Sequence, residues 1–141
     1  MKATYQTSKP QQMIDITSDA RRAVRESGVK EGICAVYTPH ATAAIIINEN
    51  HDPYVCDDIF TALNKAIPEK GDYLHDRIDN NAAAHIKASI LGPSETVPIV
   101  HGNLALGTWQ RIMLVELDGP RRHRDVLFTV IATESHPDTH S

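Results

Sequence analysis

The chain of 141 residues has little cysteine and no long apolar run, and each shortage excludes a class of protein. Its two cysteines, Cys34 and Cys56, have no spacing that resembles a disulfide framework or a zinc clip, so we expect two buried thiols. No apolar run approaches the ~20 residues of a membrane span, and the polar residues Met1 to Pro10 lack the apolar core of a signal peptide. We therefore expect a soluble, cytoplasmic protein with no membrane partner.

Positive charge is also scarce. Lys and Arg number 14 against 18 Asp and Glu, which gives a net charge of −4 and a pI near 6.0. A nucleic-acid-binding face needs an excess of basic residues, so nucleic acid is not expected as the main partner. The length suits one domain, and we expect it to span residues 1–132, followed by a frayed polar tail at 133–141.

Short runs rich in β-branched residues, bounded by Pro, Gly or Asn, predict strands. These runs are Lys2–Ser8, Met13–Ile16, Ile33–Tyr37, Ala43–Ile47, Thr96–Val100, Leu104–Leu106, Arg111–Leu117 and Val126–Ala132. A turn at residues 9–12 joins the first two, and the last four are expected to form an antiparallel meander. The Ala43–Ile47 run has no polar alternation, which predicts burial on both faces.

Helical spacing and capping signals predict three helices. The first covers Asp19–Ser27, with Thr17 or Ser18 as its cap and Gly28 as its stop. Asp52-Pro53 opens the second, in which apolar residues recur at helical spacing, and Pro68 ends it. The third covers Ala82–Leu91. Strands, inserted helices and then consecutive strands indicate an α+β fold: a single compact domain of antiparallel strands with three helices.

Groups that donate, accept and coordinate bracket the apolar Ala43–Ile47 run. His40 and Thr42 precede it, and Asn48-Glu49-Asn50 follows it. Glu49 could act as a general base or acid if apolar neighbours raise its pKa; alternatively, it caps backbone amides or pairs with an arginine. The two asparagines are equally suited to forming turns.

A second polar group follows one face of the third helix, where Asn81, His85 and Ser89 are spaced four residues apart. Such a row is unusual for a core stripe, because a buried polar group without a partner costs about 1–3 kcal/mol. The row could line a ligand site; alternatively, the helix is partly exposed and its histidine is satisfied locally.

Three histidines could supply neutral imidazoles to one divalent metal, the usual protein share of an open catalytic site. They are His40, His75 and His85, and Asp76 could orient a ring or ligate the metal itself. No two of these histidines form a short His-x-x-x-His motif, so spacing alone leaves the trio a hypothesis.

Three other segments each allow two interpretations. Glu116 lies within an apolar run and could move protons, although a salt bridge is favoured. Gly107-Thr108-Trp109-Gln110 holds the only tryptophan and could let the backbone approach an anion or a ring. Arg121-Arg122-His123-Arg124 could grip phosphate, or could be a charged hairpin tip in water.

Taken together, five ordered motifs resemble the YjbQ-like family, also called secondary thiamine-phosphate synthases, over nearly the whole chain. The motifs are His40-Ala41-Thr42-Ala43, Asn48-Glu49-Asn50-His51-Asp52-Pro53, Gly71-Asp72-Tyr73-Leu74-His75-Asp76, Ala84-His85-Ile86-Lys87-Ala88-Ser89 and Gly107-Thr108-Trp109-Gln110. This chain departs from the family pattern at Ala41, where Thr or Ser is usual, and at Arg111, where Gly is usual.

The resemblance implies a YjbQ-like fold assembled as a homotrimer, with the histidine motifs in a cleft near the subunit boundaries. It makes His40, His75 and His85 the expected metal ligands, and Glu49, Asp76 and His85 the expected catalytic residues. The expected substrate-binding residues are Thr42, Asn48, Ser89, Gly107 and Thr108. The expected ion is zinc-like at the histidines, or magnesium carried by a diphosphate.

The activity implied is the joining of a hydroxymethylpyrimidine diphosphate to a thiazole phosphate, which forms thiamine phosphate and releases pyrophosphate. Departure of pyrophosphate needs neutralisation of developing negative charge and exclusion of water. Two other functions stay open. One is a non-catalytic trimer that binds a small phosphorylated or anionic metabolite, and the other is a metal-dependent hydrolase.

Overall fold

The computed structural model describes residues 1–133, so all but the first residue of the expected 133–141 tail lies outside the described part of the chain. Thr133 itself is tied down, since its backbone N–H donates to the Glu31 carbonyl at 3.0 Å. Within residues 1–133, no helix is both long and apolar enough to cross a membrane.

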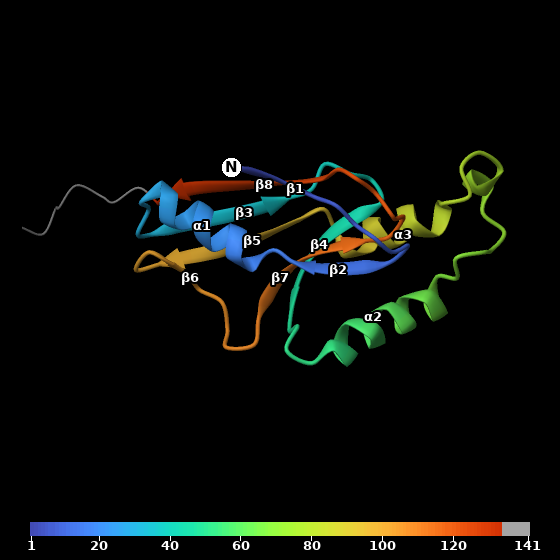
Figure 1. The fold of residues 1–141 in the computed structure, drawn as a ribbon, viewed down its shortest axis with the longest axis horizontal. Coiled ribbons are helices and arrows are strands. Elements are labelled where there is room, and N and C mark those ends of the chain that lie inside the picture. Colours follow the sequence, from blue (N-terminus) through green and yellow to red (C-terminus); the bar gives the residue numbers. More distant parts are fainter. Residues whose placement is uncertain (134–141) are drawn as a thin grey trace, which may run out of the picture.

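Two antiparallel sheets and three α-helices form one compact α+β domain, as predicted (Figure 1). The strands are β1 (Lys2–Tyr5), β2 (Gln12–Asp15), β3 (Gly32–Tyr37), β4 (Ala43–Asn48), β5 (Ser94–Val100), β6 (Asn103–Leu104), β7 (Arg111–Glu116) and β8 (Arg124–Ala132). The helices are α1 (Thr17–Ser27), α2 (Pro53–Ala66), α3 (Ala82–Leu91) and the short 3₁₀ turn η1 (Leu74–Arg77).

The strand order corrects the predicted meander. The larger sheet runs β1-β8-β3-β5-β6, and the smaller one runs β2-β7-β4. Of the last four strands, only β5 and β6 pair with each other, because β7 joins the smaller sheet and β8 the larger one. Likewise, β1 and β2 enter different sheets, so their connection is not a hairpin turn. The β1–β2, β6–β7 and β7–β8 connections each carry the chain from one sheet to the other, which strand periodicity does not reveal.

The smaller sheet is buried on both of its faces. On one face, Ala43, Ile45 and Leu114 join the main core between the two sheets and α1. On the other face, Ala44 and Val115 pack with alanines of α3. Neighbouring residues of β4 therefore enter opposite cores, as the period of two requires, and the predicted two-faced burial of this strand is confirmed.

The first helix differs from its prediction at its start. Its capping position is Ile16, and neither Thr17 nor Ser18 caps it through a side chain. The Thr17 hydroxyl instead accepts the backbone N–H of Ile112 at 2.8 Å and so joins α1 to β7. Gly28 ends the helix as predicted, with a φ of 70° that favours glycine.

The second helix begins as predicted but packs less than its apolar spacing indicates. The Asp52 carboxylate accepts the backbone N–H of Tyr54 at 2.9 Å, and Pro53 occupies the first turn. No residue of α2 is buried, and the helix lies along the outside of the molecule (Figure 1). Cys56 on this helix is only half-buried, whereas Cys34 is buried as expected. In the single chain, the apolar side chains along α2 therefore remain partly or fully exposed to solvent.

Candidate functional site

His40 is held rigidly in the loop between β3 and β4. Its Nε2 accepts the backbone N–H of Asp125, at the start of β8, at 2.9 Å. Burial and the nearby Arg124 guanidinium lower the pKa of His40 below its ordinary value. At neutral pH the ring is therefore uncharged, and because Nε2 accepts, its proton lies on Nδ1. His40 thus offers one fixed N–H donor.

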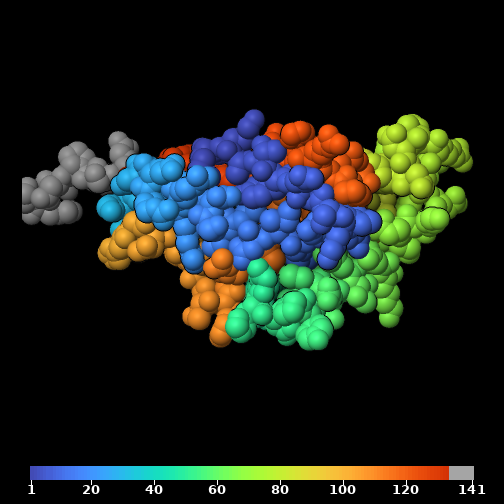
Figure 2. Space-filling model, in the orientation of Figure 1, coloured from blue at the N-terminus to red at the C-terminus, as the bar shows by residue number. Residues whose placement is uncertain are grey.

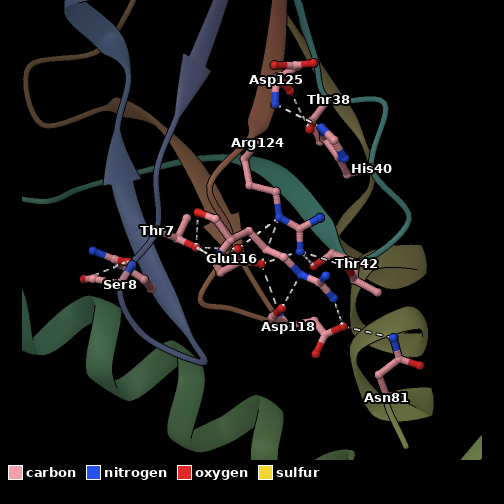
Figure 3. A network of polar contacts seen from close by, with 12 residues as sticks. Thr7, Ser8, Thr38, His40, Thr42, Asn81, Glu116, Asp118, Arg124 and Asp125 are labelled. Atoms are coloured by element: carbon pink, nitrogen blue, oxygen red, sulfur yellow. Dashed lines mark hydrogen bonds and ion pairs between the residues drawn. The ribbon is translucent and has the colours of Figure 1, made fainter. Parts of the chain in front are cut away.

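A buried ion pair supports the residues on either side of Ala41 (Figure 3). Arg124 donates to both carboxylate oxygens of Glu116, and its Nη2 also donates to the Thr42 hydroxyl at 2.9 Å. Thr7 donates its hydroxyl proton to Glu116 at 2.7 Å. Since His40 and Thr42 are both fixed by residues 124–125, the start of β8 sets the conformation of the loop.

This pair decides two of the open interpretations. Burial by itself raises the pKa of Glu116. The hydrogen bonds from Arg124 and Thr7 lower the pKa by more than burial raises it, so it lies below its ordinary value. The favoured salt bridge of Glu116 is confirmed. The 121–124 segment is not simply a charged tip, because Arg124 is buried while Arg121 pairs with Asp118 at 2.8 Å.

The histidine of α3 shares a pocket with the histidine of the β3–β4 loop. The pocket has a volume of about 220 Å³, and His40, Ala41, His85 and Ser89 are among its lining residues. Ser89 donates its hydroxyl proton to the His85 carbonyl at 2.8 Å. Two imidazoles from distant parts of the chain therefore line one concave surface, on a face of α3 that is partly exposed.

His75 lies directly against His85. The two ring centroids are 4.9 Å apart, with ring planes at 87°. The Nε2 of His75 is buried and has no hydrogen-bond partner among residues 1–133, and it lies 3.7 Å from a carboxylate oxygen of Asp79. Asp76 accepts the backbone N–H of Ala82 at 3.0 Å, so one of its oxygens stabilises the start of α3.

The three histidines do not form a metal site within one chain. In the described part of the chain, no group of three or more His, Cys, Asp or Glu side chains is arranged to hold a metal ion. His75 and His85 lie together, but the Nε2 of His40 is turned to the Asp125 amide. These residues alone therefore do not fit a bound divalent ion, and the predicted metal at the three histidines stays a prediction.

The remaining predicted residues lie at the other end of β4. Asn48 is the last residue of this six-residue strand, and Glu49 follows it, about 20 Å from the start of the strand at ~3.3 Å a residue. The Asn48 side chain accepts the backbone N–H of Glu49 at 2.7 Å, which is the local turn contact expected as its alternative role. Glu49 therefore does not reach the His40 pocket within one chain.

The end of β4 lies beside the start of β7 and the turn that precedes it, because Asn48 pairs with Arg111. Here Thr108, Trp109 and Arg111 line a second pocket, of about 280 Å³, with Asn50 and His51. Arg111 donates from Nε to Asp15 at 2.7 Å. Burial raises the pKa of Asp15, but hydrogen bonds from Arg111, Thr17 and Asn50 lower it to about 2. The predicted site residues thus divide into two groups at opposite ends of β4.

Lys87 was not identified from the sequence as a contact-forming residue. Its side chain is fully buried, and Nζ donates to Asn64 at 2.6 Å and to Glu69 at 2.5 Å. The signal was present, because Ala84, Lys87 and Ala88 share one face of α3, and both alanines are buried. This ammonium group joins α3 to α2 and to the loop that follows α2.

The fold and its site define a class: a two-sheet α+β protein with a histidine-lined pocket beside its smaller sheet. Residues 1–133 match a family model described as UPF0047 protein YjbQ-like. A UPF0047 protein of Archaeoglobus fulgidus is 45% identical and covers 90% of this chain and 98% of its own length. The chain therefore belongs to the UPF0047 family of YjbQ-like proteins.

Solved structures agree with this assignment. A YjbQ/UPF0047 family protein of Clostridium acetobutylicum is 47% identical with a TM-score of 0.89, over 93% of this chain and 99% of that one. A protein of Sulfolobus solfataricus is 37% identical with a TM-score of 0.92, over 94% of this chain and 96% of that one. The predicted YjbQ-like fold is thus confirmed, while the reaction has to be argued from the site.

Proposed function

We propose that the protein is an enzyme that acts on a small phosphorylated molecule at the pocket between His40 and His85. The reaction we propose is thiamine-phosphate synthesis, in which a hydroxymethylpyrimidine diphosphate and a thiazole phosphate are joined. The observation that carries the proposal is the shared pocket of these two histidines, which are far apart in sequence. Imidazole N–H groups are suitable donors to phosphate oxygens, whereas the single hydroxyl proton of Ser89 is donated to the His85 carbonyl.

The chemistry needs donors that are in place before negative charge develops on the departing pyrophosphate. His40 meets this need, because the Asp125 amide holds its ring and leaves Nδ1–H as a donor. Thr42, which is fixed by Arg124, keeps the adjoining loop in place. A divalent ion, if it arrives with the diphosphate, supplies further charge neutralisation.

In this proposal, Glu49 reaches the histidine pocket of a neighbouring subunit when the chain assembles as a homotrimer. In one chain it lies about 20 Å along β4 from the histidine end. A cyclic homotrimer with a head-to-tail interface would bring the Glu49 end of one subunit to the histidine end of the next. The exposed apolar residues Leu74, Ile78 and Ile90, near this histidine end, support an interface there.

The test is turnover of the two thiamine precursors by purified protein with added magnesium. We expect His85→Ala to abolish turnover without unfolding, because it removes an imidazole from the pocket. The matched control is His101→Asn, on the exposed β5–β6 turn, where asparagine tolerates the observed φ of 52°. Full activity of His85→Ala, or equal losses in both variants, would contradict the assignment.

Mixing two inactive variants tests the shared site. If Glu49→Gln and His85→Ala are unfolded and refolded together, a trimeric site restores activity in mixed assemblies, because some sites draw both intact residues from different subunits. Activity that stays absent in verified mixed assemblies excludes the sharing of Glu49. Size-exclusion chromatography with light scattering gives the mass of each assembly.

The second candidate is a non-catalytic binder of a phosphorylated or anionic metabolite. It is favoured by His40, whose fixed N–H donor in the pocket suits binding of an anion without any chemical step. Calorimetry with thiazole phosphate distinguishes the candidates: binding that depends on His85 without turnover of the paired precursors supports the binder.

A further inference from the structure

We propose that the pocket between α1 and the β5–β6 turn binds a small linear dicarboxylate. The pocket has a volume of about 370 Å³, within the ~300–1,000 Å³ typical of small-molecule sites. Its lining residues are Arg21, Val24, Arg25, Gly102, Asn103 and Leu104. Figure 1 shows α1 and β6 near the opposite end of the molecule from α3, so this pocket is separate from the histidine pocket and does not depend on the proposed function.

Two arginines of α1 line the pocket without a carboxylate partner. Arg21 and Arg25 lie one helical turn apart, so their side chains can share one ligand. Among residues 1–133, neither guanidinium makes an ion pair, whereas the adjacent Arg22 pairs with Asp19 at 3.4 Å. Figure 2 shows α1 (blue) and the β5–β6 turn (light orange) side by side on the surface, and both arginines are exposed. Their charges are therefore available to an anion from solvent.

Lys30 brings a third positive charge to the other wall of the pocket. The Gly102 backbone N–H donates to the Lys30 carbonyl at 2.9 Å, which holds the β5–β6 turn against the connection between α1 and β3. The Lys30 ammonium lies beside the same glycine, because a Cβ added at Gly102 would be 3.4 Å from Nζ. In the described part of the chain this lysine makes no ion pair either. Positive charge therefore borders the pocket on both walls.

The acidic side chains of these segments face elsewhere. Glu31 accepts the backbone N–H of His101 at 3.1 Å, and one of its oxygens lies 3.5 Å from Nδ1 of the same histidine. Glu26 of α1 lines a different hollow, beside Met1 and Phe128. A chain with a net charge of −4 thus has a local excess of positive charge at this pocket, which favours an anionic ligand there.

The apolar part of the lining indicates two carboxylates joined by methylene groups rather than one compact anion. Val24 is 2% exposed and belongs to the main core, and Leu104 packs against that core. Each guanidinium matches one carboxylate through two parallel N–H donors. Because the Cβ atoms of residues one helical turn apart are separated by about 5–6 Å, each arginine can bind its own carboxylate while a short methylene chain covers the apolar surface. Inorganic phosphate would leave that surface uncovered.

The test is calorimetric titration of the full-length protein with glutarate at low ionic strength, where charges are weakly screened. Butyrate, which has one carboxylate, and inorganic phosphate are the comparison ligands. We expect glutarate to bind at one site per chain, and both comparison ligands to bind at least about tenfold more weakly. Arg25→Gln should weaken glutarate binding about tenfold, because it removes one of the two guanidinium groups that bind a carboxylate.

The matched control is Arg22→Gln, which removes an arginine of the same helix that pairs with Asp19 and is not among the lining residues. This variant should bind glutarate as the wild type does, which separates loss of the site from loss of charge. His85→Ala should also keep glutarate binding even where thiamine-phosphate synthesis is lost. The inference is overturned if glutarate does not bind, if phosphate or butyrate binds as tightly, or if Arg25→Gln and Arg22→Gln weaken binding equally.

Discussion

Replacing Arg124 by methionine should leave a buried carboxylate without its charge partner. The side chain of Glu116 is fully buried and that of Arg124 is 5% exposed, so little water can replace the guanidinium. Arg124 donates to both Glu116 oxygens at 2.5–3.1 Å. Methionine fills much of the space of the arginine stem but donates nothing.

The expected loss is about 3 kcal/mol of the free energy of unfolding. Removal of one partner of a buried ion pair typically costs ~3–5 kcal/mol. The lower end applies here, because Thr7 and the Asp118 backbone N–H still donate to Glu116, at 2.7 and 3.1 Å. Since small domains are stable by only ~5–15 kcal/mol, such a loss is easily measured.

The dependence on pH provides the sharper signature. In the wild type, the hydrogen bonds from Arg124 and Thr7 lower the pKa of Glu116 by more than burial raises it. A lowered folded-state pKa gives stability that is present above the unfolded-state pKa and is lost as pH falls through the folded-state pKa. Without Arg124, burial dominates and the folded-state pKa rises above the unfolded one. Arg124→Met should therefore gain stability relative to the wild type as pH falls from about 7 to about 5.

Urea unfolding at a fixed protein concentration measures both effects. The double variant Arg124→Met/Glu116→Gln removes the stranded charge, so it should recover part of the stability and all of the difference in pH dependence. The reasoning is refuted if Arg124→Met loses less than about 1 kcal/mol, or if its stability runs parallel to that of the wild type across this pH range.

Two further predictions concern α2 and the metal. Lys87→Met should lower the free energy of unfolding by about 1–3 kcal/mol, because Asn64 and Glu69 lose a buried donor, while Lys65→Met on the exposed side of α2 should have little effect. Urea unfolding compares the two variants. Equal losses of the free energy of unfolding would contradict a stabilising role for the buried Lys87 ammonium group. Elemental analysis of the purified protein tests the predicted metal: one ion per chain that His75→Ala removes supports the histidine site, whereas metal-free protein with full turnover in chelator contradicts a resident metal.

Local signals in the sequence located most elements of the fold. Gly28 ends α1, and Asp52-Pro53 opens α2, because helix termini depend on residues within one turn. The β-branched run of β4 predicts a strand with both faces buried, which the two cores confirm. Such features depend on neighbours in the chain, so spacing alone is enough to find them.

The arrangement of the site depended on contacts between distant residues. The Asp125 amide that fixes His40 lies 85 positions further along the chain, and Arg124 reaches Thr42 across 82 positions. The sequence marked His40 and Thr42 as chemically capable, but it gave no sign that β8 would hold them. It also grouped Glu49 with the histidines, whereas one chain places them at opposite ends of β4.

By itself, the sequence determined the fold class, the family and the residue types available for chemistry, because composition, periodicity and ordered motifs are properties of the chain. Only the tertiary structure decided which strands share a sheet and which imidazoles share a pocket, and it showed that Lys87 and Arg124 are buried. The physical reason is that strand pairing and burial of charge are fixed by partners distant in sequence, and periodicity does not identify those partners.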